Sequence, residues 1–328
     1  MKRISLFLAC AILAAACSAP QKEETPNSEL DRIIESFWNT SAMNPTGERF
    51  AAMGEMQPYM DSCSAPFFYQ YVNEESALKR REMENGTVLH FYQAALEKLV
   101  REIPQTTVRK GTVAIWHLYN MGYVIKTPSH CFAVDLKHPE SDALVPYLDF
   151  LLITHHHGDH YTDKLNKAMT DAHKPVYSNW DSDVCSLTNL TDVRDVDLGD
   201  IKFHTEIVDH NKTHLKFVIT YYVDCGPDTD NCKMYFVGDA CSVDQLNPVG
   251  PVDIFVPHLA VGLDVKAAGE KFEPGWIFVS HLLELGHKLT QWRWSYFYGL
   301  DEMHEYHRKN VCIPVWGEKI VYTPADYR

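Results

Sequence analysis

Hydrophobic residues recur at helical spacing in the first third of the chain. The segments "ELDRIIESFW", residues 29–38, and "VLHFYQAALEKLVREI", residues 88–103, carry apolar residues three and four positions apart. This is the period of one face of an α-helix. Residues 29–108 are therefore predicted to form a helical N-terminal extension. We expect it to support the packing of the rest of the chain rather than to cap a substrate site.

Short apolar runs replace this pattern from Gly111 onward. They are typical of β-strands separated by turns, and they comprise "TVAIW", "GYVIK", "CFAVD", "FLLIT", "IKFHTEIV", "LKFVITYYV", "KMYFV", "DIFVP" and "WIFVS". Helical patterns come late, and the longest is "KLTQWRWSYFYGLDEMHEYHRK", residues 288–309. This order indicates sheets covered by helices. Residues 109–328 are therefore predicted to form one α/β domain.

The N-terminus, "MKRISLFLACAILAAACSAP", places Lys2 and Arg3 before a short apolar stretch. This arrangement is typical of a secretion signal, which we assign to residues 1–16, and the stretch is too short for an ordinary membrane span. The segment "ILAAAC" resembles a bacterial lipobox, which implies that Cys17 carries lipid. The match departs from the usual pattern because Leu13 lies four residues before the cysteine instead of three. A plain secretory signal cut nearby is the alternative.

Residues 17–28 are polar and rich in Pro and Ser, as in a flexible tether. Within them, "QKEE" resembles the acidic export tags of surface lipoproteins in some Bacteroidetes. We therefore expect an exported, outer-membrane lipoprotein that faces the periplasm or the cell surface. The membrane would be its partner through a lipidated Cys17.

The chain is acidic, with a formal net charge of −14. An acidic surface repels phosphate backbones, so a nucleic acid is not expected as a partner. A small anion drawn to a metal remains compatible with this charge. Among the nine cysteines, Cys225 and Cys232 flank a turn between two strand-like runs and are the best candidates for a disulfide in an exported protein. Two free thiols are an equally good interpretation.

A dense histidine cluster follows the strand-like run "FLLIT". The segment "THHHGDH" contains His155, His157, Asp159 and His160 on the loop that leaves the strand, where rigid scaffolds commonly mount their chemistry. His155 and His157, two residues apart, would point the same way, and Asp159 and His160 would follow the turn at Gly158. Imidazole and carboxylate are common metal ligands, so the cluster predicts a metal site.

"THHHGDH" resembles the HxHxDH signature of the metallo-β-lactamase superfamily. The resemblance implies an α/β fold, a four-layer αββα sandwich to which this chain adds the helical extension. It also implies further ligands: His210, with His214 as the alternative; Asp239 in "GDA"; and His281, with His287 as the alternative. "GTVAIWHLYNMGYVIKTPSHCFAVD" resembles the family's paired opening strands and ends in its structural aspartate, Asp135.

The resemblance also implies the chemistry of the site. Seven residues would bind two divalent metal ions: His155, His157, Asp159, His160, His210, Asp239 and His281. Asp239 would bridge both ions, and Asp159 would also orient the attacking water, so these two are the predicted catalytic residues. Zinc suits this donor set, and manganese or iron also binds mixed histidine and carboxylate sites.

The tail "CIPVWGEKIVY" resembles members similar to the L-ascorbate-6-phosphate lactonase and N-acylphosphatidylethanolamine phospholipase D branches. We therefore expect a metal-dependent hydrolase that cleaves an ester, lactone or phosphodiester bond in a small molecule or lipid. A non-catalytic, metal-containing binding lipoprotein is the alternative function. The run "QWRWSYFY", residues 291–298, is expected in the core, and the wall of a pocket for an apolar or sugar-like substrate is the alternative. His117 and Asn120 would serve either substrate contact or turn structure.

Overall fold

The computed structural model describes residues 25–259, 261–289, 291–306 and 310–327. The predicted signal peptide, Cys17 and most of the predicted tether lie outside these residues, so their assignments remain predictions. Within the described ranges, no helix combines the length and the apolar character that a membrane crossing requires.

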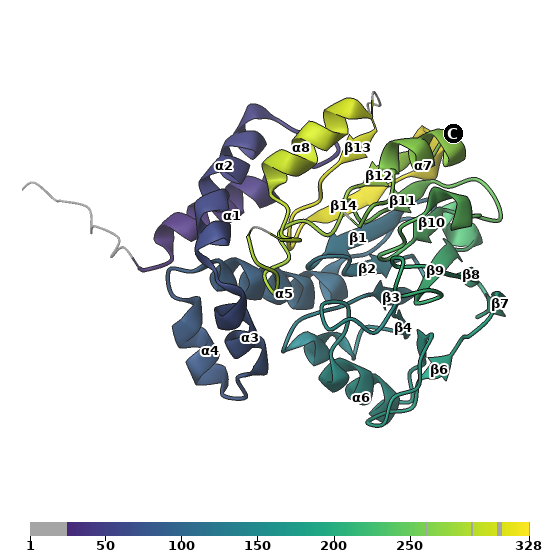
Figure 1. The fold of residues 1–328 in the computed structure, drawn as a ribbon, viewed down its shortest axis with the longest axis horizontal. Helices are drawn as coiled ribbons and strands as arrows, with labels where there is room; N and C mark the ends of the chain where they lie inside the picture. Colours follow the sequence, from purple (N-terminus) through teal and green to yellow (C-terminus); the bar gives the residue numbers. More distant parts are fainter. Residues whose placement is uncertain (1–24, 260, 290, 307–309, 328) are drawn as a thin grey trace, which may run out of the picture.

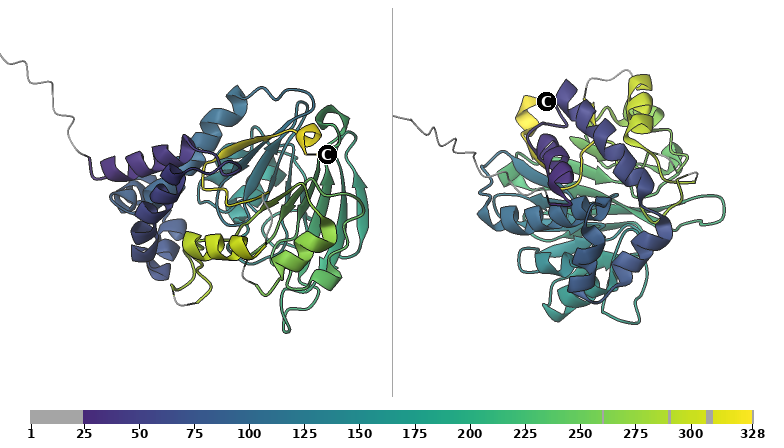
Figure 2. Two further views of the ribbon diagram at one scale, coloured as in Figure 1. Left: turned by 90° about the horizontal axis from the view of Figure 1, so that it is seen from above. Right: turned by 90° about the vertical axis from the view of Figure 1, so that its left-hand side faces the viewer.

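Two sheets of seven strands form the centre of the molecule (Figure 2). The first sheet has the order β14 (Lys319–Tyr322), β1 (Val113–His117), β2 (Tyr123–Lys126), β3 (Cys131–Val134), β4 (Phe150–Leu152), β5 (Val176–Ser178) and β6 (Thr188–Asn189). The second has the order β13 (Val311–Cys312), β12 (Trp276–Phe278), β11 (Ile254–Val256), β10 (Lys233–Phe236), β9 (Val218–Asp224), β8 (Lys202–Val208) and β7 (Arg194–Asp197).

The register of β1 explains how its residues divide between two cores. Side chains alternate between the two faces of a strand. Val113 and Ile115 accordingly belong to a buried cluster drawn from both sheets, whereas Ala114 and Trp116 belong to a second cluster shared with the helices. Every strand residue of β1 is therefore buried, which explains its continuous apolar run.

Helices cover the outer faces of both sheets. The eight α-helices are α1 (Ser28–Trp38), α2 (Gly47–Ser62), α3 (Ala65–Asn73), α4 (Ala77–Glu84), α5 (Val88–Gln105), α6 (Asp163–Asp171), α7 (Val265–Phe272) and α8 (Tyr296–Glu305) among the described residues. On the first sheet, Trp116 Nε1 donates to Glu102 Oε2 of α5 at 3.0 Å. On the second, Phe272 of α7 packs edge-on against Phe255, with ring centroids 5.5 Å apart. The four-layer αββα architecture is thus confirmed.

The structure corrects the longest helix predicted from the sequence. A helix was expected from Lys288, but α8 begins only at Tyr296. Ser295 caps it, because its hydroxyl accepts a hydrogen bond from the backbone N–H of Tyr298 at 3.1 Å. The residues before Ser295 form a loop, and this loop carries two tryptophans toward the site described below.

The helices α1 to α4 gather at one end of the molecule, on the left in Figure 1. A buried ion pair joins them to the C-terminal part of the chain: Arg49 Nη2 of α2 lies 2.6 Å from Glu318 Oε2, with side chains 1% and 4% exposed. Arg49 also donates to the backbone oxygen of Ile313 at 2.9 Å, and Trp38 donates to that of Trp316. The extension therefore packs on the body of the protein, as expected.

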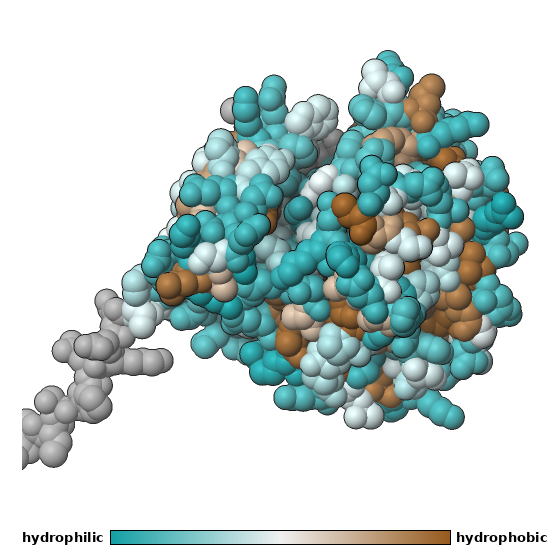
Figure 3. Space-filling model, turned by 90° about the horizontal axis from the view of Figure 1, so that it is seen from below, coloured by the Kyte–Doolittle hydropathy of each residue, from teal (hydrophilic) through white to brown (hydrophobic). Residues whose placement is uncertain are grey.

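Hydrophilic residues cover most of the face shown in Figure 3, with scattered apolar groups among them. Such scattering is normal on a folded protein and identifies no docking surface. Cys225 and Cys232 are both buried, and the Cys225 N–H donates to the Cys232 carbonyl at 2.9 Å. Cys225 has a thiol rather than half of a disulfide, which favours the second of the two interpretations.

Candidate metal centre

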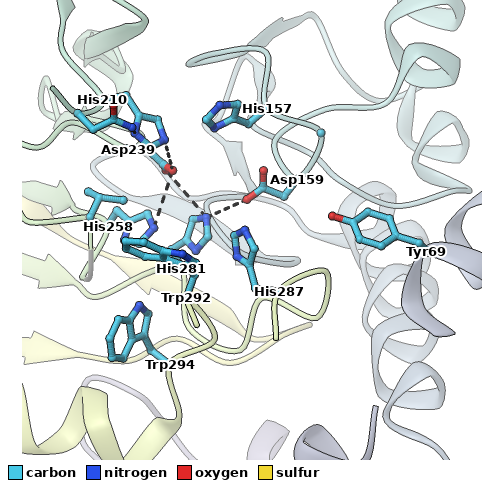
Figure 4. Close-up of a pocket in the computed structure, with 13 residues that line it drawn as sticks. Tyr69, His157, Asp159, His210, Asp239, His258, His281, His287, Trp292 and Trp294 are labelled. Atoms are coloured by element: carbon cyan, nitrogen blue, oxygen red, sulfur yellow. Dashed lines mark hydrogen bonds and ion pairs between the residues drawn. The ribbon is translucent and has the colours of Figure 1, made fainter. Parts of the chain in front are cut away.

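The predicted ligands lie where strands of the two sheets end. His155 follows β4, His210 follows β8, Asp239 follows β10 and His281 follows β12. Because β10, β11 and β12 are parallel, their carboxyl ends meet at one edge of the second sheet. Figure 4 shows side chains from these strand ends converging on a single pocket.

One donor group combines three histidines and Asp239. His155, His157, His210 and Asp239 each offer one ligand atom, and these atoms lie within 4.8 Å of one another. His210 Nε2 is 3.3 Å from Asp239 Oδ2, and His155 Nε2 is 3.7 Å from the same oxygen. His155 is fully buried, so its ring position is fixed by packing.

A second donor group contains Asp159, His160 and His281, again with ligand atoms within 4.8 Å. His281 Nε2 lies 2.9 Å from Asp159 Oδ2. Asp239 faces this group through its other oxygen, Oδ1, which is 3.3 Å from His160 Nε2 and 3.9 Å from His281 Nε2. The two carboxylate oxygens of Asp239 thus face different groups, as a bridging ligand requires.

Gly238 allows Asp239 to reach this position. Its φ of +49° lies in the left-handed region, and a Cβ there would come within 2.6 Å of Thr154 Oγ1. Any other residue would both strain the backbone and collide with the start of the histidine loop. Glycine is therefore required before Asp239, because the segment after β10 packs closely against the segment after β4.

Asp135 orients His160 from behind. His160 Nδ1 donates to Asp135 Oδ2 at 2.9 Å, and Asp135 also accepts hydrogen bonds from the backbone N–H and the hydroxyl of Thr154, at 2.8 and 2.7 Å. This arrangement of a carboxylate behind a histidine is the usual support of a metal-binding imidazole. It leaves His160 Nε2 directed at Asp159 and Asp239.

Asn120 connects the turn between β1 and β2 to the second donor group. Its side-chain Nδ2 donates to Asp159 Oδ2 at 3.2 Å, and its carbonyl accepts from the backbone N–H of His281 at 3.2 Å. Asn120 and His281 both have positive φ, +50° and +61°, a conformation that costs free energy in residues other than glycine and clusters at functional sites. Asn120 therefore positions two of the predicted ligands, Asp159 and His281. His117 supports it by donating from Nε2 to the same carbonyl.

The hydrogen bonding and the protonation of the predicted ligands are those expected of a metal site. His160 Nε2 and Asp239 Oδ1 are buried and have no hydrogen-bond partner among the described residues, although an unpaired buried polar atom is costly. Burial disfavours the charged form of Asp239. The imidazoles around it, first His258 and then His160, outweigh burial and hold its pKa well below the ordinary value. Burial lowers the pKa of His157 to about 4. An anionic carboxylate and a neutral imidazole are the protonation states that bind metals.

The two alternative histidines lie outside the donor groups. His214 is exposed, and its ring centroid is 5.9 Å from that of His210. His287 lines the pocket, but its Nδ1 lies 2.9 Å from Oε2 of the buried Glu284 instead of facing a predicted ligand.

A histidine that the sequence prediction missed lies at the centre. His258 belongs to a third donor group with Asp239 and His281, and it is 4% exposed. Like the predicted ligand His281, it comes directly after a strand-like run, since "DIFVP" is followed by His258. The family resemblance offers no position for it, so the sequence prediction does not include it.

The cavity above the donors has a volume of about 420 Å³, within the range of small-molecule sites. Trp292 and Trp294 line it, and Trp292 is 58% exposed. For these two tryptophans the structure supports the pocket-wall alternative over the favoured core position. Tyr69 of α3 lines the cavity as well, opposite the tryptophans in Figure 4. The extension, expected only to support packing, therefore also forms part of the pocket wall.

Comparisons with known proteins bear on the fold. No protein-family model matches the sequence, and no curated protein matches it. Among solved structures, the metallo-beta-lactamase fold protein YhfI from Bacillus subtilis is 12% identical, with 64% of this chain and 99% of that chain covered and a TM-score of 0.50. Igni18, a metallo hydrolase from Ignicoccus hospitalis, is 13% identical over 64% and 98%, with a TM-score of 0.48. An isothiocyanate hydrolase from Delia radicum gut bacteria is 14% identical over 64% and 99%, with a TM-score of 0.49. The likeness to YhfI shows that this chain has the metallo-β-lactamase fold.

Proposed function

We propose that the protein is a metal-dependent hydrolase that cleaves an ester, lactone or phosphodiester bond in a small molecule or lipid. One observation carries the proposal: the seven residues predicted as ligands form two donor groups joined by Asp239, beneath a cavity large enough for a small molecule. Fold alone does not determine function, whereas these side chains supply the donor atoms that metal-dependent hydrolysis requires.

His155, His157 and His210 would bind one ion, Asp159, His160 and His281 the other, and Asp239 both. Two divalent ions so bound would lower the pKa of a water to about 7 and stabilise the negative charge that develops on the carbonyl or phosphoryl oxygen of the substrate. Zinc is the ion we propose, because imidazole outnumbers carboxylate in the set. Manganese and iron are the alternatives that elemental analysis distinguishes.

Asp159 would orient the attacking water and accept its proton. It lines the cavity, and its Oδ2 is fixed by Asn120 and His281. Burial opposes ionisation of Asp159, but His160 and His281 outweigh it and hold its pKa well below the ordinary value. The side chain is therefore a carboxylate, which can accept a hydrogen bond but has no proton to donate.

His287 would donate a proton to the leaving group. It lines the cavity together with Asp159, and the Glu284 carboxylate, whose Oε2 lies 2.9 Å from His287 Nδ1, raises its pKa above the ordinary value. Glu284 is itself fixed, since its Oε1 accepts from Tyr119 Oη at 3.0 Å and from the Gly286 N–H at 2.8 Å. A histidine oriented by a buried carboxylate is a suitable general acid near neutral pH.

We also propose that the protein is exported and anchored to the outer membrane through a lipidated Cys17. Residues 1–16 support this, because basic residues precede an apolar stretch, and a polar tether follows them. Radiolabelled palmitate should enter the wild-type chain and not Cys17→Ser. Equal labelling of both would overturn the anchor. The acidic charge supports a small molecule or a lipid as substrate and argues against a nucleic acid.

The first experiment is elemental analysis of the purified protein, paired with hydrolysis of bis-p-nitrophenyl phosphate, a lactone, a simple ester and a β-lactam. Two metal ions per chain and one hydrolysed substrate, with activity lost in Asp159→Ala and Asp239→Ala, would support the proposal and identify the bond type. Absence of bound metal even after reconstitution would overturn it and favour the binding lipoprotein.

A further inference from the structure

His258 lies at the boundary between the two donor groups. It follows β11, the strand between the one that leads to Asp239 and the one that leads to His281. A bridge between His258 and Ser280 extends the parallel pairing of β11 and β12 past the last strand residue. The backbone therefore carries His258 to the same edge of the sheet as the predicted ligands.

The imidazole of His258 faces Asp239. Its Nε2 lies 3.9 Å from Asp239 Oδ2, as Figure 4 shows by a dashed line. This separation is too long for a hydrogen bond. Zinc bonds to nitrogen and oxygen of about 2.0–2.2 Å place two donors of one ion at most about 4 Å apart, so a single ion can span the gap. The pair His281 Nε2 and Asp239 Oδ1 has the same separation, 3.9 Å.

The ring of His258 also stacks on a predicted ligand. The centroids of His258 and His281 are 3.8 Å apart with an interplanar angle of 23°. Ring stacking alone would explain why an aromatic residue occupies position 258. Stacking on His281 would not require a nitrogen atom close to Asp239. Phenylalanine would also be a more apolar buried stacking partner than an imidazole.

We propose that His258 is an eighth metal donor of this centre, binding on the side where Asp239 and His281 meet. The inference rests on the proposed function, because it concerns the same metal ions. The centre would then contain six imidazoles and two carboxylates. A higher share of nitrogen favours zinc or iron over manganese and magnesium, which prefer oxygen ligands.

The test measures metal binding by the full chain and does not depend on activity. Wild type, His258→Ala and His258→Phe are stripped of metal, shown by circular dichroism to be folded, and titrated with zinc and with manganese against a chromophoric chelator. Metal content is measured by elemental analysis. His258→Phe keeps an aromatic ring and removes the donor nitrogen. His214→Ala is the matched control, because it removes a nearby histidine that lies outside the donor groups.

If His258 is a ligand, both His258 variants should bind one of the two zinc ions about 10- to 100-fold more weakly than wild type. Both should also lose part of the preference for zinc over manganese, and His214→Ala should match wild type. Wild-type affinity in both variants would overturn the inference and leave the proposed function intact. Loss in His258→Ala with wild-type affinity in His258→Phe would also overturn it, in favour of ring packing. A wild type that binds no metal would overturn the proposed function itself.

Discussion

The Nδ1 atom of His160 and the Oδ2 atom of Asp135 form a hydrogen bond of 2.9 Å between two side chains that are both 0% exposed. Asp135 has a positive φ, +48°, so the backbone bears a conformational cost to bring its carboxylate there. The hydrogen bond to Asp135 fixes a single ring orientation for His160, in which Nε2 faces the predicted metal position. Asp135 is thus a positioning residue for the second donor group.

Replacing Asp135 by asparagine should weaken metal binding without changing a ligand. The amide can present its NH₂ group to Nδ1, and the ring of His160 would then rotate or change tautomer. We expect the affinity of the second ion to fall about 10- to 100-fold, measured by chelator competition. Asp171→Asn, on the exposed end of α6, is the control. Unchanged affinity in Asp135→Asn would contradict the orienting role.

Metal binding should release protons. Burial disfavours the imidazolium of His160, but Asp159, Asp239 and Asp135 outweigh it and raise its pKa well above the ordinary value in the absence of a metal ion. His160 is therefore an imidazolium at neutral pH, and it must lose the proton on Nε2 before this nitrogen can bind a metal. Affinity should rise with pH, by up to about tenfold per pH unit for each proton displaced.

Titration calorimetry in two buffers of different ionisation enthalpy measures these protons directly. A pH-independent affinity, with no difference between the buffers, would show that His160 is neutral before the metal arrives. His160→Ala should abolish part of the release, and His214→Ala should leave it intact.

The buried ion pair between Arg49 and Glu318 should be important for stability. Removing one member leaves a buried charge without compensation, which costs about 3–5 kcal/mol of unfolding free energy. Arg49→Met should therefore lower the midpoint of urea denaturation clearly. Arg32→Met is the matched control, because the Arg32 pair with Glu29 is exposed and exposed pairs contribute little. Equal effects of the two substitutions would refute the role of burial.

Tyr69 should affect substrate binding although it lies in the N-terminal extension. A Cβ at Gly286 would come within 2.9 Å of Tyr69 Oη, so the tyrosine lies directly against the loop of the pocket. An aromatic contact contributes about 0.5–1.5 kcal/mol beyond buried area. Tyr69→Ala should raise KM about two- to tenfold with little change in kcat. Phe50→Ala, which removes an exposed aromatic residue of α2 outside the cavity, should leave KM unchanged.

His287→Gln should lower kcat in a manner that depends on the leaving group. Positioned acids contribute about 10²- to 10⁴-fold to rates, and this loss should appear with alkoxide leaving groups and largely vanish with p-nitrophenolate, which needs no proton. Because the pKa of His287 is raised, the wild-type kcat should fall as pH rises through that pKa. Glu284→Gln should move this decline to lower pH. The same loss with both kinds of leaving group would exclude the acid role.

The sequence predicted what depends on local pattern and on fixed spacing. The strand ends and the loop from His155 to His160 follow from short apolar runs and the residues that end them, whereas Asp239 is expected only from the family resemblance. The choice of His210 over His214 followed from one further observation, namely that His210 comes first after its strand.

Long-range packing accounts for the parts that the sequence did not predict. His258 comes directly after an apolar run, as His281 does, but its entry into the site depends on the position of β11 between β10 and β12, an order that strand patterns alone do not give. Tyr69 reaches the cavity through the packing of α3, a helix that lies far before Asp159 in the sequence. Trp292 precedes the cap of α8, and its apolar character resembles that of a core residue until the helix start is known.

The pairing of β1 with β14 has a consequence for biosynthesis. The ribosome makes Val113 long before Tyr322, the residue with which it pairs, and Arg49 long before Glu318. Until β14 has been made, β1 is an open edge of its sheet, and Arg49 of the extension lacks its ion-pair partner Glu318. The chain therefore completes this sheet only after β14 has been made. A product that stops early would expose a strand edge and an unpaired charge, the features that chaperones and quality-control proteases act on.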